Sequence, residues 1–261
     1  MDMKRLIGLS TTLLASSIAS AGTMGPVATS QSFHPVIAIQ GGYASLNASN
    51  NEALFIGTDL DRFDYSNTNN QTNGGFIGAF LGAENSLDFL AYPGIFMQLG
   101  VEYDYYSPYN VDGVNTVGIN NNTLTTWAFN YQVQTQQVMG LLRLYGTYDR
   151  FYPYGEVGLG AAFNEADKYN VTVTSAGSNN LTPLFSRATQ TQFSYNLGFG
   201  VEAAVMSNVR VGLGYRYSNF GSFNLGDGGI SFNNYQFPVP FTLSGSNAYT
   251  NQLLARISYV A

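Results

Sequence analysis

The segment Met97-Gln98-Leu99-Gly100-Val101-Glu102-Tyr103-Asp104-Tyr105 decides the fold class of this chain. Large apolar or aromatic side chains occupy every second position, and Gln, Gly, Glu and Asp occupy the positions between them. Because successive side chains of a β-strand point to opposite faces, this period of two predicts a strand with one apolar and one polar face. Such a strand suits a wall with lipid on one side and a polar interior on the other.

The same alternation recurs along the chain, and we predict eight strands that carry it. Each is long enough to cross a bilayer, which takes about 9 to 11 tilted residues. The predicted strands are 35–46, 74–84, 95–106, 133–147, 152–164, 192–206, 209–220 and 249–260.

The connections between these strands fall into two classes that alternate. Those at 85–94, 148–151 and 207–208 are short or modest, whereas 47–73, 107–132, 165–191 and 221–248 are long. A soluble β-sandwich also has alternating strands, but long loops at every second connection are unusual in a compact soluble domain. The pattern predicts an all-β fold, an eight-stranded antiparallel up-and-down transmembrane β-barrel with four long outer loops and three short periplasmic turns. Because the loops are rich in Asn, Ser, Thr and Gly, we expect them to be mobile and without regular structure.

The composition supports a membrane barrel and excludes several other classes. Charged residues make up 10% of the 261 residues, against roughly 25% in an ordinary soluble protein. No stretch approaches the roughly 20 apolar residues of a membrane-spanning helix. The absence of cysteine excludes disulfides and thiolate metal sites, and a net charge of -6 argues against a nucleic-acid partner.

The N-terminus has the pattern of a secretory signal peptide. Lys4 and Arg5 precede an uncharged, mostly apolar run at 6–18, and Ala19-Ser20-Ala21 follows as a cleavage site. We therefore expect a signal peptide at 1–21 that is cleaved after Ala21, a short periplasmic leader at 22–33 and the barrel at 34–261.

Aromatic residues cluster toward the strand ends, where we expect them to form girdles at the two membrane interfaces. We expect the single tryptophan, Trp127, to be an interface anchor as well. The girdle candidates are Tyr103, Tyr105, Tyr106, Tyr148, Phe151, Tyr152, Tyr154, Tyr215 and Tyr217.

The polar face of the strands carries the candidate site. An eight-stranded barrel encloses just enough space for side chains, so inward charges are forced together, and we predict an ion-pair and hydrogen-bond network that fills the lumen. A gated pore in which these pairs exchange partners is the alternative. Inward glycines at 198, 200, 212 and 214 would make room for the long side chains. The predicted network comprises Glu102, Asp104, Arg143, Glu156, Glu202, Arg210, Arg216 and Arg256.

Enzymatic and metal chemistry find little support in the residues. The only histidine, His34, precedes the first strand and is expected on the periplasmic side, far from any Ser and acid in the outer loops. Asp59, Asp61 and Asp64 could gather around calcium, but they lack the other EF-hand positions, and we expect solvated loop acids. We predict no catalytic residue, no metal and no cofactor.

With its signal peptide, strand count, loop alternation and inward acid and Arg residues, the chain resembles the small outer-membrane barrels of the OmpA, OmpX and opacity-protein superfamily. The resemblance covers residues 34–261 and includes the final strand Gln252-Leu253-Leu254-Ala255-Arg256-Ile257-Ser258-Tyr259-Val260-Ala261. Such barrels usually end on an aromatic residue, whereas here Tyr259 lies two positions before Ala261. We expect no peptidoglycan-binding domain after the barrel, unlike in the two-domain members.

The resemblance implies a location in the outer membrane of a Gram-negative bacterium. It also implies contact with outer-membrane lipids and lipopolysaccharide, and assembly by the outer-membrane insertion machinery with periplasmic chaperones. Our first hypothesis is a structural and surface-interaction role, in envelope integrity and in adhesion-type contacts of the loops with a host or environmental ligand. The alternatives are a narrow porin-like channel for ions or small solutes and, less favoured, a lipid A-modifying enzyme.

Overall fold

The computed structural model describes residues 33–49, 51–56, 61–67, 71–87, 94–117, 125–175, 182–232, 235–239 and 241–261. The predicted signal peptide, its cleavage after Ala21 and the leader up to residue 32 lie outside these residues. No helix in the described part of the chain is long and apolar enough to span a bilayer.

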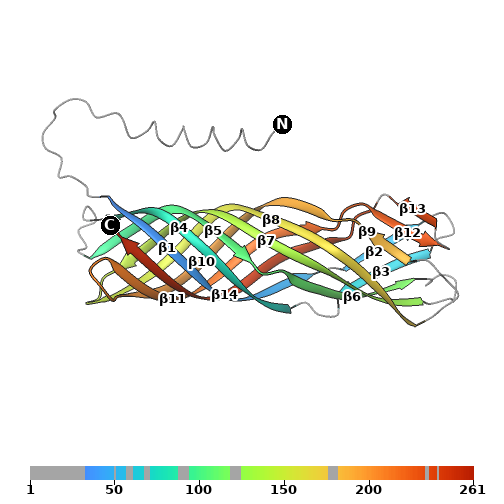
Figure 1. Cartoon of the computed structure of the whole chain (residues 1–261), viewed down its shortest axis with the longest axis horizontal. Coiled ribbons are helices and arrows are strands. Elements are labelled where there is room, and N and C mark those ends of the chain that lie inside the picture. The colour runs from blue at the N-terminus through green and yellow to red at the C-terminus, as the bar shows by residue number, and fades with distance from the viewer. Residues whose placement is uncertain are drawn as a thin grey trace, which may run out of the picture. The chain divides into compact units, whose positions relative to one another are not determined.

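Eight strands of the described chain form a closed antiparallel ring, which confirms the predicted barrel (Figure 1). Each strand pairs with the next one around the ring, and the last pairs with the first along Val36 to Ser49. In order, the ring consists of β1 (His34–Ser49), β4 (Gln71–Ser86), β5 (Ile95–Tyr106), β7 (Thr125–Gly146), β8 (Phe151–Ser175), β10 (Ala188–Ala204), β11 (Val209–Asn224) and β14 (Ser244–Val260).

The two fully described short connections lie at one end of the ring, together with the C-terminus. Tyr148 and Phe151 exchange two backbone hydrogen bonds of 2.9 Å, and Asp149 between them has φ of 55°, a left-handed conformation that Asp tolerates better than most residues. The backbone N–H of Ala261 donates to the carbonyl of Pro35 at 2.9 Å, which ties the last residue to β1. We call this the periplasmic end, because short turns of such barrels face the periplasm.

The long connections differ from our expectation, because their described parts contain further strands. β3 pairs with β2 and with β6, and β6 pairs with the outer part of β7. At this side the barrel wall therefore extends well beyond the ends of the shorter ring strands. β12 pairs with β13 and β9 in a separate sheet. These strands are β2 (Asn51–Ile56), β3 (Asp61–Asn67), β6 (Tyr109–Val117), β9 (Thr182–Phe185), β12 (Gly228–Phe232) and β13 (Tyr235–Val239).

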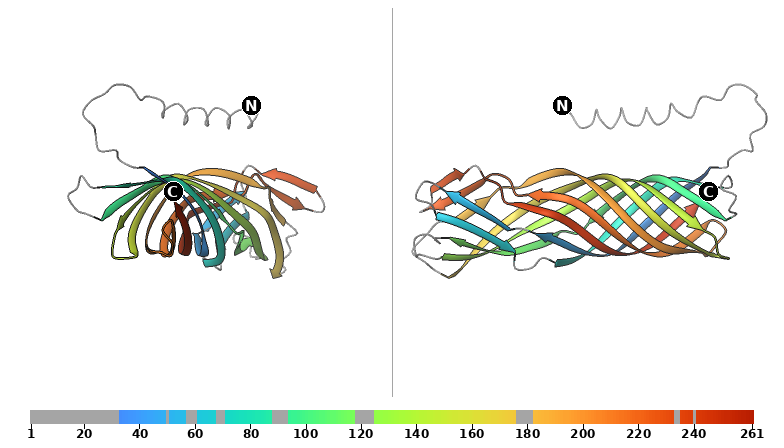
Figure 2. Two further views of the ribbon diagram at one scale, coloured as in Figure 1. Left: turned by 60° about the vertical axis from the view of Figure 1, so that its left-hand side comes forward. Right: turned by 180° about the vertical axis from the view of Figure 1, so that it is seen from behind.

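We call these six strands, with residues 125–133 of β7 and 165–175 of β8, the outer lobe (Figure 2). Composition alone did not predict these strands, because it does not show which backbone partners a segment will find. The long ends of β7 and β8 supply such partners, and Val111 pairs with Tyr131. Paired backbone groups offset the cost of ordering polar sequence.

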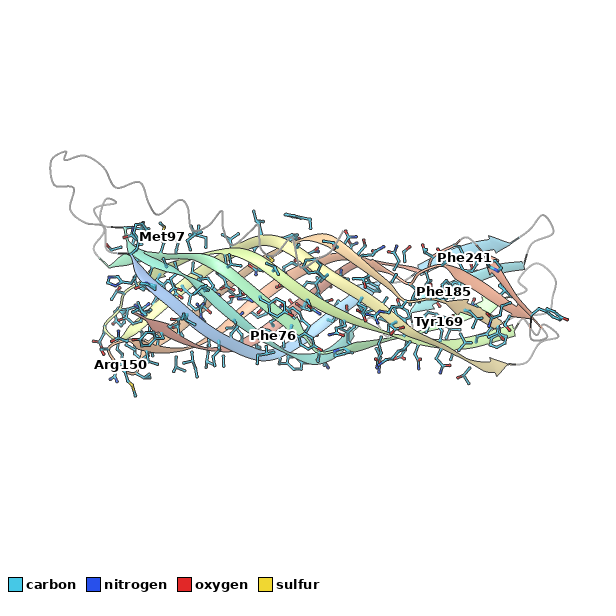
Figure 3. The ribbon with its side chains drawn as sticks, turned by 45° about the horizontal axis from the view of Figure 1, so that its top comes forward. Phe76, Met97, Arg150, Tyr169, Phe185 and Phe241 are labelled. Carbon is cyan, nitrogen blue, oxygen red and sulfur yellow. The ribbon has the colours of Figure 1, made fainter. Side chains whose placement is uncertain are left out.

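The interior of the outer lobe is hydrophobic and rich in aromatic residues. Tyr65 and Phe129 pack edge to face at 5.6 Å, as do Tyr169 and Phe185 at 4.8 Å. In Figure 3, Arg150 and Met97 mark the periplasmic end, and Tyr169, Phe185 and Phe241 gather at the opposite one. The lobe is therefore a packed body whose core continues into the adjoining end of the barrel.

Apolar side chains cover the outside of the ring, as predicted for a wall that faces lipid. They alternate with buried residues along each strand, and Leu81 is 65% exposed while Phe80 is 1% exposed. Exposed members include Ile37, Ile39, Ile77, Leu81, Leu99, Val101, Leu159, Phe193, Leu197, Phe199, Leu213, Leu253 and Ile257.

Four aromatic residues lie elsewhere than we predicted. Trp127 is buried in the core of the outer lobe and not at a membrane interface. Tyr106, Tyr152 and Tyr154 point into the barrel, because their positions have the parity of the lumen-facing residues of β5 and β8. Tyr148 and Phe151, in contrast, are exposed at the periplasmic end.

Candidate functional site in the barrel lumen

The central part of the lumen is filled by four charged residues from four strands. Glu102 on β5, Arg143 on β7, Glu156 on β8 and Arg216 on β11 all occupy inward positions, and each is buried. Arg143 and Glu156 are direct cross-strand partners, whereas Arg216 approaches from the far side of the ring. Closure of a small barrel brings them together.

These four side chains form a ring of ion pairs. Arg143 contacts Glu102 through Nη2 at 2.6 Å and Glu156 through Nε at 2.6 Å. Arg216 contacts the same two carboxylates, with Nη1 at 2.8 Å from Glu102 and Nε at 2.6 Å from Glu156. Each acid thus contacts two guanidinium groups, and these contacts offset the free-energy cost of removing the charges from water.

Asp104 extends this ring toward the outer lobe. Its Oδ2 lies 3.1 Å from Arg216 Nη1, and its Oδ1 accepts a hydrogen bond of 2.9 Å from Gln40. Beyond it lies an uncharged polar layer, in which Gln252 donates to Tyr106 and Ser218 at 3.0 Å each. The hydrophobic core of the lobe begins next to this layer, since Tyr106 belongs to both.

Arg256 and Glu202 lie on the periplasmic side of the ring and are less tightly paired. Their closest charged atoms are 3.6 Å apart, and Glu202 also accepts hydrogen bonds from Tyr145 at 2.9 Å and Ser258 at 3.1 Å. The guanidinium groups of Arg143 and Arg256 lie 4.7 and 5.0 Å from the centre of the Phe80 ring. Phe80 therefore packs against both cations.

Arg210 closes the periplasmic mouth with a partner that the sequence analysis missed. Its two terminal nitrogens donate to the two carboxylate oxygens of Glu84 at 2.6 and 2.9 Å. The guanidinium also lies 4.9 Å from the Phe96 ring centre and 4.5 Å from that of Tyr152. Glu84 lies on the same inward face as Phe80, so the alternation of side chains could have identified it. The sequence analysis left it out because Glu84 is the last residue of the predicted strand 74–84.

The inward glycines leave space for this network. A Cβ added to Gly198 would lie 2.7 Å from Glu156 Oε1, and one added to Gly214 would lie 2.5 Å from the Tyr154 hydroxyl. Gly200 and Gly212 would meet Tyr154 and Glu202 in the same way. Glycine in these strands thus fits the close approach of neighbouring side chains.

The lumen therefore contains five carboxyl and four guanidinium groups among its described residues. Charged, aromatic and amide side chains follow one another along its length and are linked by the contacts described above. His34 lies at the periplasmic end, where its Nδ1 is 3.0 Å from the Ala261 carbonyl oxygen. No cluster of three or more possible metal ligands occurs among the described residues, and Asp59 lies outside them.

The family model that matches this chain agrees with the architecture. A family model described as an outer membrane protein beta-barrel domain matches residues 11–241. The outer membrane protein OprG from Pseudomonas aeruginosa is 12% identical, with 85% of this chain and 95% of OprG covered and a TM-score of 0.42. Neisserial surface protein A is 14% identical, with 85% and 96% covered and a TM-score of 0.36. The attachment invasion locus protein Ail of Yersinia pestis is 13% identical, with 85% and 97% covered and a TM-score of 0.28. No curated protein matches the chain.

Proposed function

Because this chain belongs to the family of outer membrane protein beta-barrel domains, we propose that it is a non-conducting surface barrel of the outer membrane. Its wall contributes to envelope structure, and its outer lobe makes contacts outside the cell. The fully buried ring of Arg143, Glu102, Glu156 and Arg216 carries the first part of this proposal. Ions would have to displace paired charges to pass, which costs several kcal/mol per ion.

The outer lobe supports the second part of the proposal. Its hydrophobic core holds the strands in a defined arrangement, so the lobe presents a preformed surface and not a set of separate loops. The four long connections contain eight acidic and three basic residues. A neutral or cationic surface ligand, of host or environmental origin, therefore fits this lobe better than a polyanion.

The chain is exported by the signal peptide at 1–21, cut after Ala21, and inserted by the outer-membrane assembly machinery with periplasmic chaperones. It has no enzymatic activity, because His34 lies at the periplasmic end, away from the outer leaflet. Unchanged acylation of lipopolysaccharide by the purified protein, measured by mass spectrometry, is the expected result.

Conductance in planar lipid bilayers tests the plugged lumen. We expect the purified protein to give no steady conductance steps, because described side chains fill the lumen between Glu84 and Asp104. A large, steady conductance would favour the narrow porin-like channel instead. Removal of several charges at once, as in Glu102→Ala with Arg143→Ala, should create openings if the variant still inserts.

Deletion of the β12–β13 hairpin separates the two roles. Cells without the protein should become more sensitive to sodium dodecyl sulfate, and a variant that lacks 228–239 should restore resistance if the wall alone supports the envelope. The same variant should lose attachment to surfaces. Full attachment by this variant would rule out the hairpin as the contact region.

A further inference from the structure

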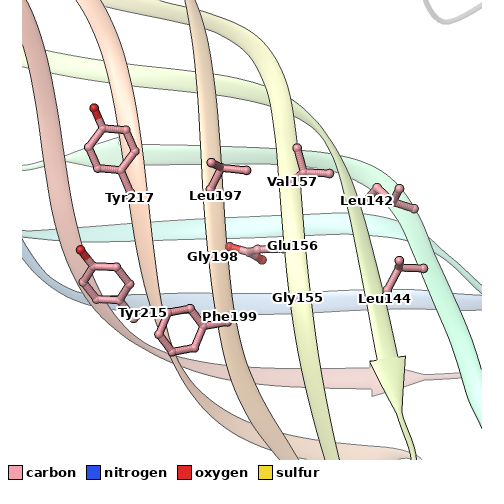
Figure 4. A pocket seen from close by; sticks show the side chains of 10 residues that line it. All are labelled: Leu142, Leu144, Gly155, Glu156, Val157, Leu197, Gly198, Phe199, Tyr215 and Tyr217. Atoms are coloured by element: carbon pink, nitrogen blue, oxygen red, sulfur yellow. The ribbon is translucent and has the colours of Figure 1, made fainter.

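The lipid-facing side of the barrel has a hollow of about 470 Å³ between β7 and β11 (Figure 4). Its walls are apolar or aromatic, and Leu144, Leu197 and Phe199 are 48%, 54% and 63% exposed. Figure 4 shows Leu144 on one side of Gly155 and Phe199 on the other, while the Glu156 side chain lies on the far side of the wall. The hollow therefore opens to the membrane, and at its floor it borders Glu156 of the charged lumen.

Gly155 forms the floor of this hollow, and no contact within the barrel accounts for it. Its cross-strand partners are Leu144 and Phe199, yet a Cβ added to Gly155 would meet no atom within 4 Å. Gly198, by contrast, is needed to accommodate Glu156. A strand glycine often marks a place where another molecule approaches closely, and the absence of a side chain at Gly155 keeps this hollow open.

The hollow rises toward the outer face as it crosses the wall. Gly155 is four residues from the periplasmic start of β8 at Phe151, and Tyr217 is eight residues from that of β11 at Val209. With a rise of about 3.4 Å per residue and a tilt of about 45°, Tyr217 lies about 10 Å nearer the outer face. The hollow therefore follows an oblique path through the hydrocarbon region.

Tyrosines gather at the upper end of the hollow. The Tyr217 ring lies 6.2 Å from that of Tyr195 and 5.6 Å from that of Tyr249, and Tyr215 donates to Asn251 Oδ1 at 2.5 Å. Amphipathic rings of this kind lie at the boundary between hydrocarbon and polar head groups. The apolar end thus suits a hydrocarbon chain, and the tyrosine end suits the polar group that carries it.

We propose that this hollow binds one acyl chain of an outer-leaflet lipid with a sugar head group, the lipid A part of lipopolysaccharide. The inference rests on the proposed outer-membrane location and adds a defined lipid site to it. A second copy of the barrel fits the hollow less well, because two convex walls meet along a narrow line and leave a concavity unfilled. A thin, flexible acyl chain can follow it.

Native mass spectrometry of the full chain in dodecyl maltoside, with added rough-type lipopolysaccharide, tests the site. Gly155→Leu places a side chain in the hollow and should weaken retention of one lipid about tenfold, the effect of displacing about two methylene groups. Gly140→Leu is the matched control, because Gly140 is also exposed on the lipid face and an added Cβ would meet only Leu159 O at 3.6 Å. This control should retain the lipid like the wild type.

Phe199→Ala removes one wall of the hollow and should weaken retention as well, which keeps the test valid if Gly155→Leu fails to fold. Equal retention by the wild type and both hollow variants would overturn the site, as would an equal loss in Gly140→Leu. Equal binding of palmitoyl-oleoyl-phosphatidylglycerol would overturn the outer-leaflet source, and a dimer lost in Gly155→Leu would identify a second copy as the occupant. Heat-dependent gel mobility and conductance, measured in parallel, show separately whether the proposed membrane barrel itself is wrong.

Discussion

Arg143 binds Glu102 and Glu156 at the same time, at 2.6 Å each, and all three residues are buried. Glu102 and Glu156 belong to strands on either side of β7, so one side chain joins three neighbouring strands inside the barrel. The stability of the ring should therefore depend strongly on this arginine.

Arg143→Met should lower the free energy of unfolding by about 3 to 5 kcal/mol, because two buried carboxylates lose a partner. Urea-induced unfolding in lipid vesicles, followed by gel mobility, measures the change. Arg187→Met is the control: its ion pair with Glu165 has a 59% exposed arginine side chain, and its loss should cost about 0 to 1 kcal/mol. Equal effects of the two substitutions would contradict a stabilising network.

Arg210→Lys tests the periplasmic mouth. Lysine keeps the charge but loses the two-pronged contact with Glu84 and the stacking between Phe96 and Tyr152, so we expect a loss of about 1 to 2 kcal/mol. Arg150→Lys, an exposed substitution in the Tyr148–Phe151 turn at the same end, should leave stability unchanged. If Arg210→Lys left the free energy of unfolding unchanged, charge alone would be what matters at this position.

Gly214→Ala should destabilise the barrel by about 1 to 3 kcal/mol through overpacking, since its Cβ would lie 2.5 Å from the Tyr154 hydroxyl. Tyr154→Phe in the same chain should recover part of the loss by removing that hydroxyl. Gly155→Ala is the matched control on the opposite face of the wall, where a Cβ has open space, and it should be neutral or slightly stabilising. Absence of any rescue would mean that the clash lies with the Phe199 carbonyl instead.

Trp127 fluorescence reports where the only tryptophan lies. Because Trp127 is 6% exposed in the core of the outer lobe, its emission should be blue-shifted and poorly quenched by aqueous acrylamide. Lipids brominated near the interface should quench it weakly too. Strong quenching by those lipids would restore the interface position that the sequence suggested.

The alternation of residues such as Leu99, Gly100, Val101 and Glu102 determined much of the fold. A period of two assigns each side chain to a face wherever strands form, and the segment 95–106 coincides with β5. The outer lobe was missed because composition does not reveal whether a polar segment finds a paired neighbour. β3 forms against β6 through pairs such as Tyr65 with Asn115, which lie 50 residues apart in the chain.

In the lumen, too, the sequence determined which face each residue occupies, and the tertiary structure determined which residues meet. The sequence by itself placed Glu102, Arg143, Glu156 and Arg216 on the inward face, because parity is a local property of each strand. Only the tertiary structure decided which charges meet, that Glu84 and not another acid holds Arg210, and that Trp127 is buried in the outer lobe. Partners depend on register and on closure of the ring, which are set by all eight strands together and by no single segment.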